Sequence, residues 1–328
     1  MNFLKIGKPM KKSYLFVSLA LWGGFLLSAC SSSSPLNEEP VPLPGEQDPA
    51  VAQIREVTVV ARDVLPSTST TRTAFELQTD RLSFSWAEGD KIGVVPQTSD
   101  AESQVGLTIS GGAGQKSARF TGGGWALRSD INYVAYYPFD DMTTTLSQVT
   151  FSYDGQQQTG NASLAHLGTH DFMYAASTAA VEEALTFDFK HLSSIGQFNL
   201  TVPAAGSFTS LTLRCNDELF PHTATLSLTD GSFMPADARD NILEMSLTNV
   251  STTAANEVVT CYLNLPPIDL TGHIVSVILR STADRVYQGT LVSKTLESGR
   301  AYRFDAALTD VTVSTVIPAP GFGNETVE

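Results

Sequence analysis

Cysteine, basic residues and long apolar runs are scarce in this 328-residue sequence, and each shortage excludes a class of protein. Only 3 cysteines are present, too few for a scaffold held together by disulfides. A single long apolar run excludes a polytopic membrane protein. The 34 acidic residues outnumber the 20 basic ones, and no Lys/Arg-rich stretch offsets the net charge of −14, so we expect no nucleic-acid partner.

The first 30 residues have the form of an export signal. Basic residues precede an apolar stretch from Tyr14 to Leu27, and Leu-Ser-Ala then leads to Cys30. This ending resembles the lipobox of bacterial lipoproteins, in which the cysteine thiol takes a diacylglycerol and becomes the new N-terminus. The resemblance implies that Cys30 is a lipidation site. An ordinary cleaved secretory signal with a chance cysteine is the alternative.

The remainder of the chain predicts a tether followed by two domains. Residues 31–53 are poor in apolar residues and contain several prolines and acids, which is typical of a flexible linker. From Glu56 onward, apolar residues alternate with polar ones in short runs separated by turn clusters, a pattern that predicts an all-β fold. The stretch STAAVEEA, which begins at Ser177, interrupts this pattern. We therefore predict two antiparallel β-sandwich domains, residues 54–183 and 184–328, with a final strand or tail in the second.

Beyond Cys30 the sequence contains two cysteines, Cys215 and Cys261, each within a strand-like run. An exported protein permits a disulfide between them, and two buried thiols that pack as small hydrophobic groups are the alternative. Neither cysteine has a histidine neighbour at the spacing of metal ligands, so we expect no metal there.

Motifs in order along the chain resemble the fimbrillin family, the lipoprotein pilins and adhesins of certain Gram-negative anaerobes. The first motif is a Thr-Arg-Thr segment around Arg72, followed by Trp-Ala-Glu-Gly-Asp-Lys-Ile starting at Trp86. In this turn, Gly89 is expected to supply a positive φ and Asp90 to accept backbone N–H bonds. The later landmarks are Phe120, YVAYYPF at 133–139, DFMYA at 171–175, FDFKH at 187–191 and LESGRAY at 296–302.

The resemblance implies a transthyretin-like version of the sandwich and assembly by donor-strand exchange. In the polymerising members of the family, a protease cuts after an arginine, the first strand leaves, and a strand of the next subunit fills the groove. The matching arginine here is Arg72, which lies in a Ser/Thr-rich stretch. The strand that would leave lies within 55–62 and is marked by Glu56, Val57, Val59 and Ala61. Other members are not processed, so Arg72 is either a cleavage site or a simple loop arginine.

A candidate donor strand lies near the other end of the sequence. Its alternating apolar residues are Val311, Val313 and Ile317, and Pro318 follows them. The alternative is that this segment is simply the last strand of the second domain. The partners implied are other pilin subunits, the outer membrane through the lipid on Cys30, and a host or bacterial surface ligand. The implied location is the cell surface or a fimbrium.

We expect no enzymatic activity, cofactor or metal. His166 and His170 are four residues apart, but Gly168 and Thr169 between them disfavour the helix that zinc ligation at this spacing requires. Asp140 and Asp141 do not have the alternating pattern of a calcium loop. His191 is interpreted as a structural histidine that forms hydrogen bonds.

A second functional hypothesis is a surface glycan-binding lipoprotein of a nutrient-uptake system. Such a protein would use exposed aromatic side chains such as Trp125, Tyr136 or Tyr153 to stack against sugars. The order of landmarks favours the fimbrial hypothesis. A lipid-anchored enzyme is a third and weaker hypothesis, because the sequence offers no nucleophile, base or metal ligands at a convincing spacing.

Overall fold

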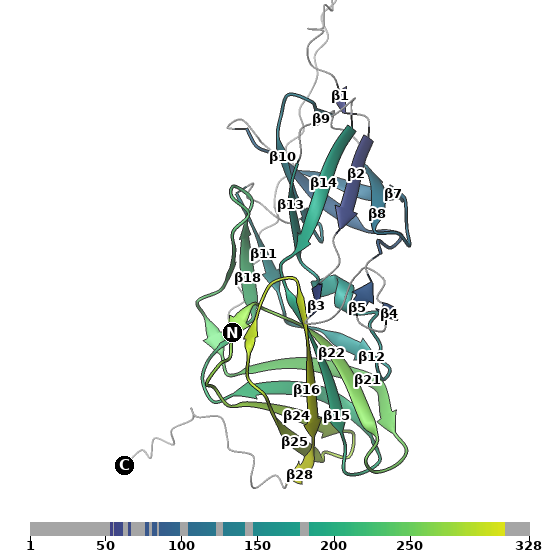
Figure 1. Cartoon of the computed structure of the whole chain (residues 1–328), viewed down its shortest axis with the longest axis vertical. Coiled ribbons are helices and arrows are strands. Elements are labelled where there is room, and N and C mark those ends of the chain that lie inside the picture. Colours follow the sequence, from purple (N-terminus) through teal and green to yellow (C-terminus); the bar gives the residue numbers. More distant parts are fainter. Residues whose placement is uncertain are drawn as a thin grey trace, which may run out of the picture. The chain divides into compact units, whose positions relative to one another are not determined.

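The computed structural model describes residues 53–54, 56–61, 65–66, 76–78, 81–83, 85–98, 104–122, 127–141, 147–177 and 184–311. Within these residues the protein is built from strands (Figure 1), and the one helical element is the short 3-10 helix η1 (Leu167–His170). The predicted all-β class is therefore confirmed. None of the described elements is a helix long and apolar enough to cross a membrane.

A closed sheet of strands forms the first structural feature. In spatial order it contains β10 (Tyr133–Tyr137), β13 (Met173–Ala176), β14 (Ala184–His191), β2 (Glu56–Ala61), β8 (Ser117–Thr121), β7 (Val105–Gly111) and β6 (Lys91–Pro96), which pairs again with β10. All neighbours in this barrel are antiparallel except β14 and β2, which are parallel.

Two open sheets are formed mainly by strands that follow the barrel in the sequence. The four-stranded sheet has the order β22 (Val258–Leu265), β15 (Ser194–Thr201), β27 (Arg300–Ala307) and β3 (Leu65–Pro66). The six-stranded sheet has the order β12 (Gln157–Thr159), β21 (Ile242–Thr252), β16 (Gly206–Cys215), β24 (Val275–Ser281), β25 (Val286–Leu291) and β28 (Thr309–Val311).

Smaller sheets complete the fold. Three strands, β11 (Gln148–Ser152), β18 (Thr223–Ser227) and β19 (Phe233–Pro235), form one of them. The others are pairs: β1 (Gln53–Ile54) with β9 (Leu127–Arg128), β4 (Glu76–Gln78) with β5 (Arg81–Ser83), β17 (Phe220–Pro221) with β20 (Arg239–Asp240), and β23 (Ile268–Asp269) with β26 (Thr295–Leu296).

The apolar residues gather mainly in two clusters. The barrel core lies inside the closed sheet and surrounds Trp86, whose ring meets Phe120, Tyr137 and Phe189 edge-on at centroid distances of 5.2, 5.4 and 5.8 Å. The second core draws on both large open sheets, with Phe198 of β15 and Leu213 of β16 among its members. In strands such as β2 and β8, period-two alternation separates the buried face from the solvent-facing one, whereas β10 is buried on both faces.

The turn after Trp86 has the geometry that the sequence predicts. Gly89 has a φ of 87°, a backbone conformation that L side chains rarely adopt. The Asp90 carboxylate accepts a hydrogen bond from the Ala87 N–H at 2.7 Å and another from the Tyr137 hydroxyl at 3.1 Å. The Trp-Ala-Glu-Gly-Asp motif therefore fixes the chain between the barrel core and the first residues of β6.

The predicted division into domains at residue 183 stays a prediction. The strand β14, which begins at Ala184, belongs to the barrel and pairs with both β2 and β13. The next strand, β15, begins at Ser194 in the four-stranded sheet. The chain thus leaves the barrel within the short stretch between His191 and Ser194.

Candidate functional site

The strand β2 closes the barrel, because it lies between β14 and β8 (Figure 1). Its residues pair in parallel with β14 from Glu56 opposite Ala184 to Ala61 opposite Phe189. On its other side it pairs antiparallel with β8, with Val59 opposite Ala118. Both edges of β2 are therefore engaged in sheet hydrogen bonding.

The inner face of β2 is part of the barrel core. Val57, Val59 and Ala61 are 5%, 0% and 2% exposed and belong to the same cluster as Trp86. Glu56 and Val60 lie on the outer face and are exposed. The alternation predicted for the leaving strand is thus confirmed in its burial, while its departure stays a prediction.

Removal of β2 would convert the barrel into an open groove. The facing edges of β14 and β8 would each present unpaired N–H and C=O groups, which readily accept another strand. The floor of the groove would consist of the apolar side chains that Val57, Val59 and Ala61 now cover. Such a groove accepts an extended segment with apolar residues at every second position.

The flanking strands of β2 pair elsewhere. Before it, β1 pairs with β9, with Gln53 opposite Arg128. After it, β3 pairs in parallel with β27, with Leu65 opposite Arg300. The segment 53–66 is therefore held by four strand pairings, two of them made by β2. All three of its strands precede Arg72, which lies outside the described residues.

The candidate donor strand is only partly described. Val311 ends β28 and pairs with Val286 of β25, at the edge of the six-stranded sheet. Asp310, beside it, forms an ion pair with Arg285. Val313 and Ile317 lie outside the described residues, as does the lipidation candidate Cys30. The described part of this segment thus forms an edge strand of its own chain.

His166 and His170, the two histidines considered as zinc ligands in the sequence, contact different backbone carbonyls. His166 Nε2 lies 2.8 Å from the carbonyl oxygen of Tyr262, whereas His170 Nε2 lies 3.0 Å from the carbonyl oxygen of Asp154. The two rings therefore have different partners. Among the described residues, no group of three His, Cys, Asp or Glu side chains could hold a metal ion.

His191 is a buried histidine with an acidic partner. Its Nδ1 lies 2.8 Å from Asp171 Oδ1, and both side chains are 2% exposed. The pairing of β13 with β14 brings them together, because Met173 lies opposite His191. The interpretation of His191 as a structural histidine is consistent with this buried contact.

Cys215 and Cys261 are both buried free thiols. Burial raises the pKa of the Cys261 thiol to about 12 from its ordinary value of 9.0. The structure therefore contains the two packed thiols of the sequence alternatives and no disulfide between them.

The raised pKa of Cys261 predicts a loss of stability in alkaline solution. Below about pH 9 the thiol is protonated in both states, but above it the unfolded chain releases a proton that the folded chain retains, so stability falls as the pH rises. Between about pH 8 and about pH 10.5, the free energy of unfolding should fall by about 2 kcal/mol more in the wild type than in Cys261→Val. Urea unfolding at the two pH values measures this difference, and equal losses in the two proteins would contradict it.

Two of the three aromatic residues proposed for glycan stacking are not exposed, which corrects the expectation for those two. Tyr136 and Tyr153 are fully buried, and Trp125 lies outside the described residues. Tyr136 belongs to β10, whose two faces are both covered: Tyr137 and Tyr133 point into the barrel core, whereas Tyr136 belongs to the second core. Neither tyrosine can therefore stack on a sugar at the surface.

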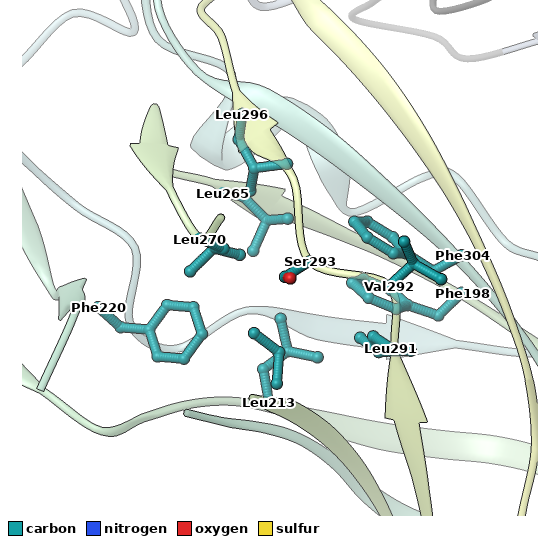
Figure 2. Close-up of a pocket in the computed structure, with 11 residues that line it drawn as sticks. Phe198, Leu213, Phe220, Leu265, Leu270, Leu291, Val292, Ser293, Leu296 and Phe304 are labelled. Atoms are coloured by element: carbon teal, nitrogen blue, oxygen red, sulfur yellow. The ribbon is translucent and has the colours of Figure 1, made fainter. Parts of the chain in front are cut away.

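The cavity in Figure 2 is also unsuited to a sugar. It has room for about 10 Å³, close to the minimum for one water molecule. Its lining is almost entirely apolar; the labelled side chains that converge on it are Phe198, Leu213, Phe220, Leu265, Leu270, Leu291, Val292, Leu296 and Phe304, with Ser293 as the polar exception. It is a small packing defect of the second core.

A shallow polar groove of about 460 Å³ lies on the outer face of the four-stranded sheet. Its side chains bond to one another, with Asn199 Nδ2 donating to Asp305 Oδ1 at 2.9 Å and Gln197 Nε2 donating to Asn199 Oδ1 at 3.2 Å. No aromatic residue is among those that line this groove. The described residues around it therefore provide no platform for sugar stacking.

Sequence reasoning missed one set of polar residues, Gln156, Gln158 and Asn161. Residues 152–161 are polar and glycine-containing, which is typical of a turn. In the structure Gln157–Thr159 forms β12, and Gln156 and Gln158 are buried. The available signal was the run of three glutamines between Gly155 and Gly160, which is unusually uniform for a turn.

Solved structures of known proteins resemble this fold. A candidate cell adhesion protein from Bacteroides ovatus matches with 17% identity and a TM-score of 0.52, over 80% of this chain and 97% of that one. A candidate cell adhesion protein from Bacteroides uniformis matches with 14% identity and a TM-score of 0.47, over 69% and 93% of the two chains. No curated protein sequence gives a significant match.

A family model gives the assignment. The model described as fimbrillin-like matches residues 71–319, which contain every landmark from Arg72 to Tyr302. The resemblance drawn from those landmarks is therefore confirmed, and the chain belongs to the fimbrillin-like family.

Proposed function

We propose that this chain is a lipid-anchored fimbrial subunit or adhesin that assembles by donor-strand exchange after proteolysis at Arg72. The family match supports a structural role in a pilus or in cell adhesion, and we infer that the chain has no enzymatic activity. The lipid on Cys30 would hold the protein at the outer membrane. The predicted arrangement of two transthyretin-like sandwich domains, divided near residue 183, belongs to the same proposal.

The observation that carries the proposal is the position of β2. This strand closes the barrel by pairing on both sides, buries three apolar side chains, and precedes the candidate cleavage site in the sequence. Cleavage at Arg72 would separate β1, β2 and β3 covalently from the body while leaving their pairings in place. Exchange then requires an incoming strand that reproduces the contacts of β2.

The candidate donor matches the first four residues of β2. Glu56-Val57-Thr58-Val59 corresponds to Asp310-Val311-Thr312-Val313, so an acid, a valine, a threonine and a valine occupy the same order in both segments. In the groove, Val311 and Val313 would occupy the inward positions of Val57 and Val59. The strand β28 lies at a sheet edge and has one neighbour, β25, so its release breaks a single strand pairing.

Intact mass and native gels test the proposal on protein from cell surfaces, with and without a trypsin-like protease at limiting concentration. We expect a mass that begins at Thr73 together with a ladder of oligomers. Arg72→Ala should retain the N-terminal segment and give no ladder, whereas the control Arg62→Ala should behave as the wild type. A mass that begins at acylated Cys30, without a ladder after protease treatment, would reject processing and assembly by this route.

A further inference from the structure

The strand β22 lies at the end of the four-stranded sheet, with β15 on one side. In an antiparallel strand, consecutive residues turn their backbone groups to alternate sides. Val258, Thr260, Tyr262 and Asn264 turn theirs away from β15, toward the residues that follow Gly155. An edge of this length normally attracts the strand of another molecule.

Side-chain amides occupy that edge in place of a strand. Gln156 accepts from the Asn264 N–H at 2.8 Å and donates to the Asn264 carbonyl at 2.9 Å. Gln158 accepts from the Tyr262 N–H at 2.8 Å and donates to the Thr260 carbonyl at 2.9 Å.

Asn161 continues this arrangement toward Val258, and His166 binds the one carbonyl that lies between the contacts of the two glutamines. Asn161 accepts from the Thr260 N–H at 2.7 Å and donates to the Val258 carbonyl at 3.2 Å. The Tyr262 carbonyl lies 2.8 Å from His166 Nε2, which must carry the proton because a carbonyl oxygen only accepts. The backbone groups from the Val258 carbonyl to the Asn264 carbonyl that face this side are therefore all bonded.

We call Gln156, Gln158 and Asn161 the amide ladder. A primary amide offers one acceptor and two donor hydrogens in a plane, as a peptide group does with its C=O and N–H, so each member imitates one residue of a missing strand. Gln156 and Gln158 are 2% and 0% exposed. Burial removes competition from water, which makes these bonds expensive to lose.

The backbone of this segment is fixed to the other large sheet. β12 pairs in parallel with β21, with Gln157 opposite Ser246, and the bonds from the Ser246 N–H to Gln156 O and from the Gly160 N–H to Thr248 O continue this contact. One short segment thus extends the six-stranded sheet with its main chain and covers the end of the four-stranded sheet with its side chains.

We propose that the amide ladder closes the β22 edge to the strands of other copies and thereby restricts strand addition to the barrel groove. The occupant that it excludes is β22 of a second copy, because two identical antiparallel edges can pair about a two-fold axis. The restriction to the groove rests on the proposed function. The closing of the β22 edge does not depend on the proposed function, because it concerns the uncleaved chain.

The test uses the full uncleaved chain with Arg72→Ala as the background. Gln156→Leu/Gln158→Leu removes the buried amides at nearly constant volume, and Asn161→Ala removes an exposed one, so it provides a variant that retains the core. Gln157→Leu is the matched control, since Gln157 is exposed and bonds to Thr248 Oγ1 rather than to β22. Sedimentation velocity over a range of concentrations and amide hydrogen exchange are the measurements.

We expect amide exchange at Thr260 to rise about tenfold or more in Asn161→Ala, and concentration-dependent dimers in both ladder variants but not in the control. If the double variant does not fold, the oligomeric state and amide exchange of Asn161→Ala test the proposal. Ladder variants that stay monomeric with wild-type exchange along β22 would overturn the proposal. Because no cleavage is involved, this result is independent of whether Arg72 is processed.

Discussion

Val59→Asp is expected to destabilise the barrel by about 4 kcal/mol or more, because it places a carboxylate at a fully buried position in the apolar barrel core. Small domains are stable by only about 5–15 kcal/mol, so this loss removes a large fraction of the stability of the barrel. Chemical denaturation followed by the fluorescence of the buried Trp86 measures the change, with the other tryptophans replaced by Phe.

The neighbouring residue provides the control for this variant. Val60 belongs to the same strand but lies on its outer face, where it is 37% exposed. Val60→Asp should therefore change the free energy of unfolding by less than about 1 kcal/mol. If β2 is a detachable strand, a peptide with the sequence of residues 53–66 should bind to Val59→Asp and restore its stability. Equal effects of the two substitutions would contradict the burial pattern of β2.

Replacement of Val311 and Val313 by Asp is expected to abolish the oligomer ladder of the cleaved protein. In the proposed exchange these two side chains take the inward places of Val57 and Val59, so each substitution would place a charge in the groove. The loss of affinity should exceed about a hundredfold, which is visible as the disappearance of oligomers on native gels.

The monomer should tolerate this change, because Val311 is only half-buried at a sheet edge. A melting temperature close to that of the wild type would show that the loss concerns assembly rather than folding. Thr312→Asp is the matched control, since the alternation places residue 312 on the opposite face. Persistence of the ladder in the Val311→Asp/Val313→Asp variant would reject this segment as the donor.

The strands that the sequence predicts best have one buried face. In β2 the alternation predicts that Val57, Val59 and Ala61 point inward, and these three side chains lie in the barrel core. The turn at Gly89 has the predicted positive φ, which glycine itself permits. Local alternation and turn chemistry are properties that a few neighbouring residues determine.

The burial of Tyr136 could not be predicted in the same way. Alternation along β10 indicates a face toward one core, but the opposite face contacts a second core formed by residues distant in the sequence. The sequence pattern therefore predicts that an aromatic residue on the other side of the strand lies at the surface. Only the arrangement of sheets shows that both faces are covered.

The amide ladder could not be predicted from the sequence for a related reason. Gln156 and Asn264 are 108 positions apart, and no local pattern indicates that they meet. Polar, glycine-flanked residues are typical of a turn, and the sequence contains no apolar alternation in this segment. The pairing of β12 with β21 joins residues that are distant in the sequence, such as Gln157 and Ser246, so neighbouring residues do not indicate it.

The parallel pairing of β2 with β14 also determines how the protein resists a mechanical force applied along these two strands. A pull at Gln53 that is opposed at His191 acts on opposite ends of two strands that run in the same direction. The hydrogen bonds between them are then loaded in shear, all at once, rather than opened one by one from an end. A subunit that retains β2 would therefore hold under tension until the whole strand slides free.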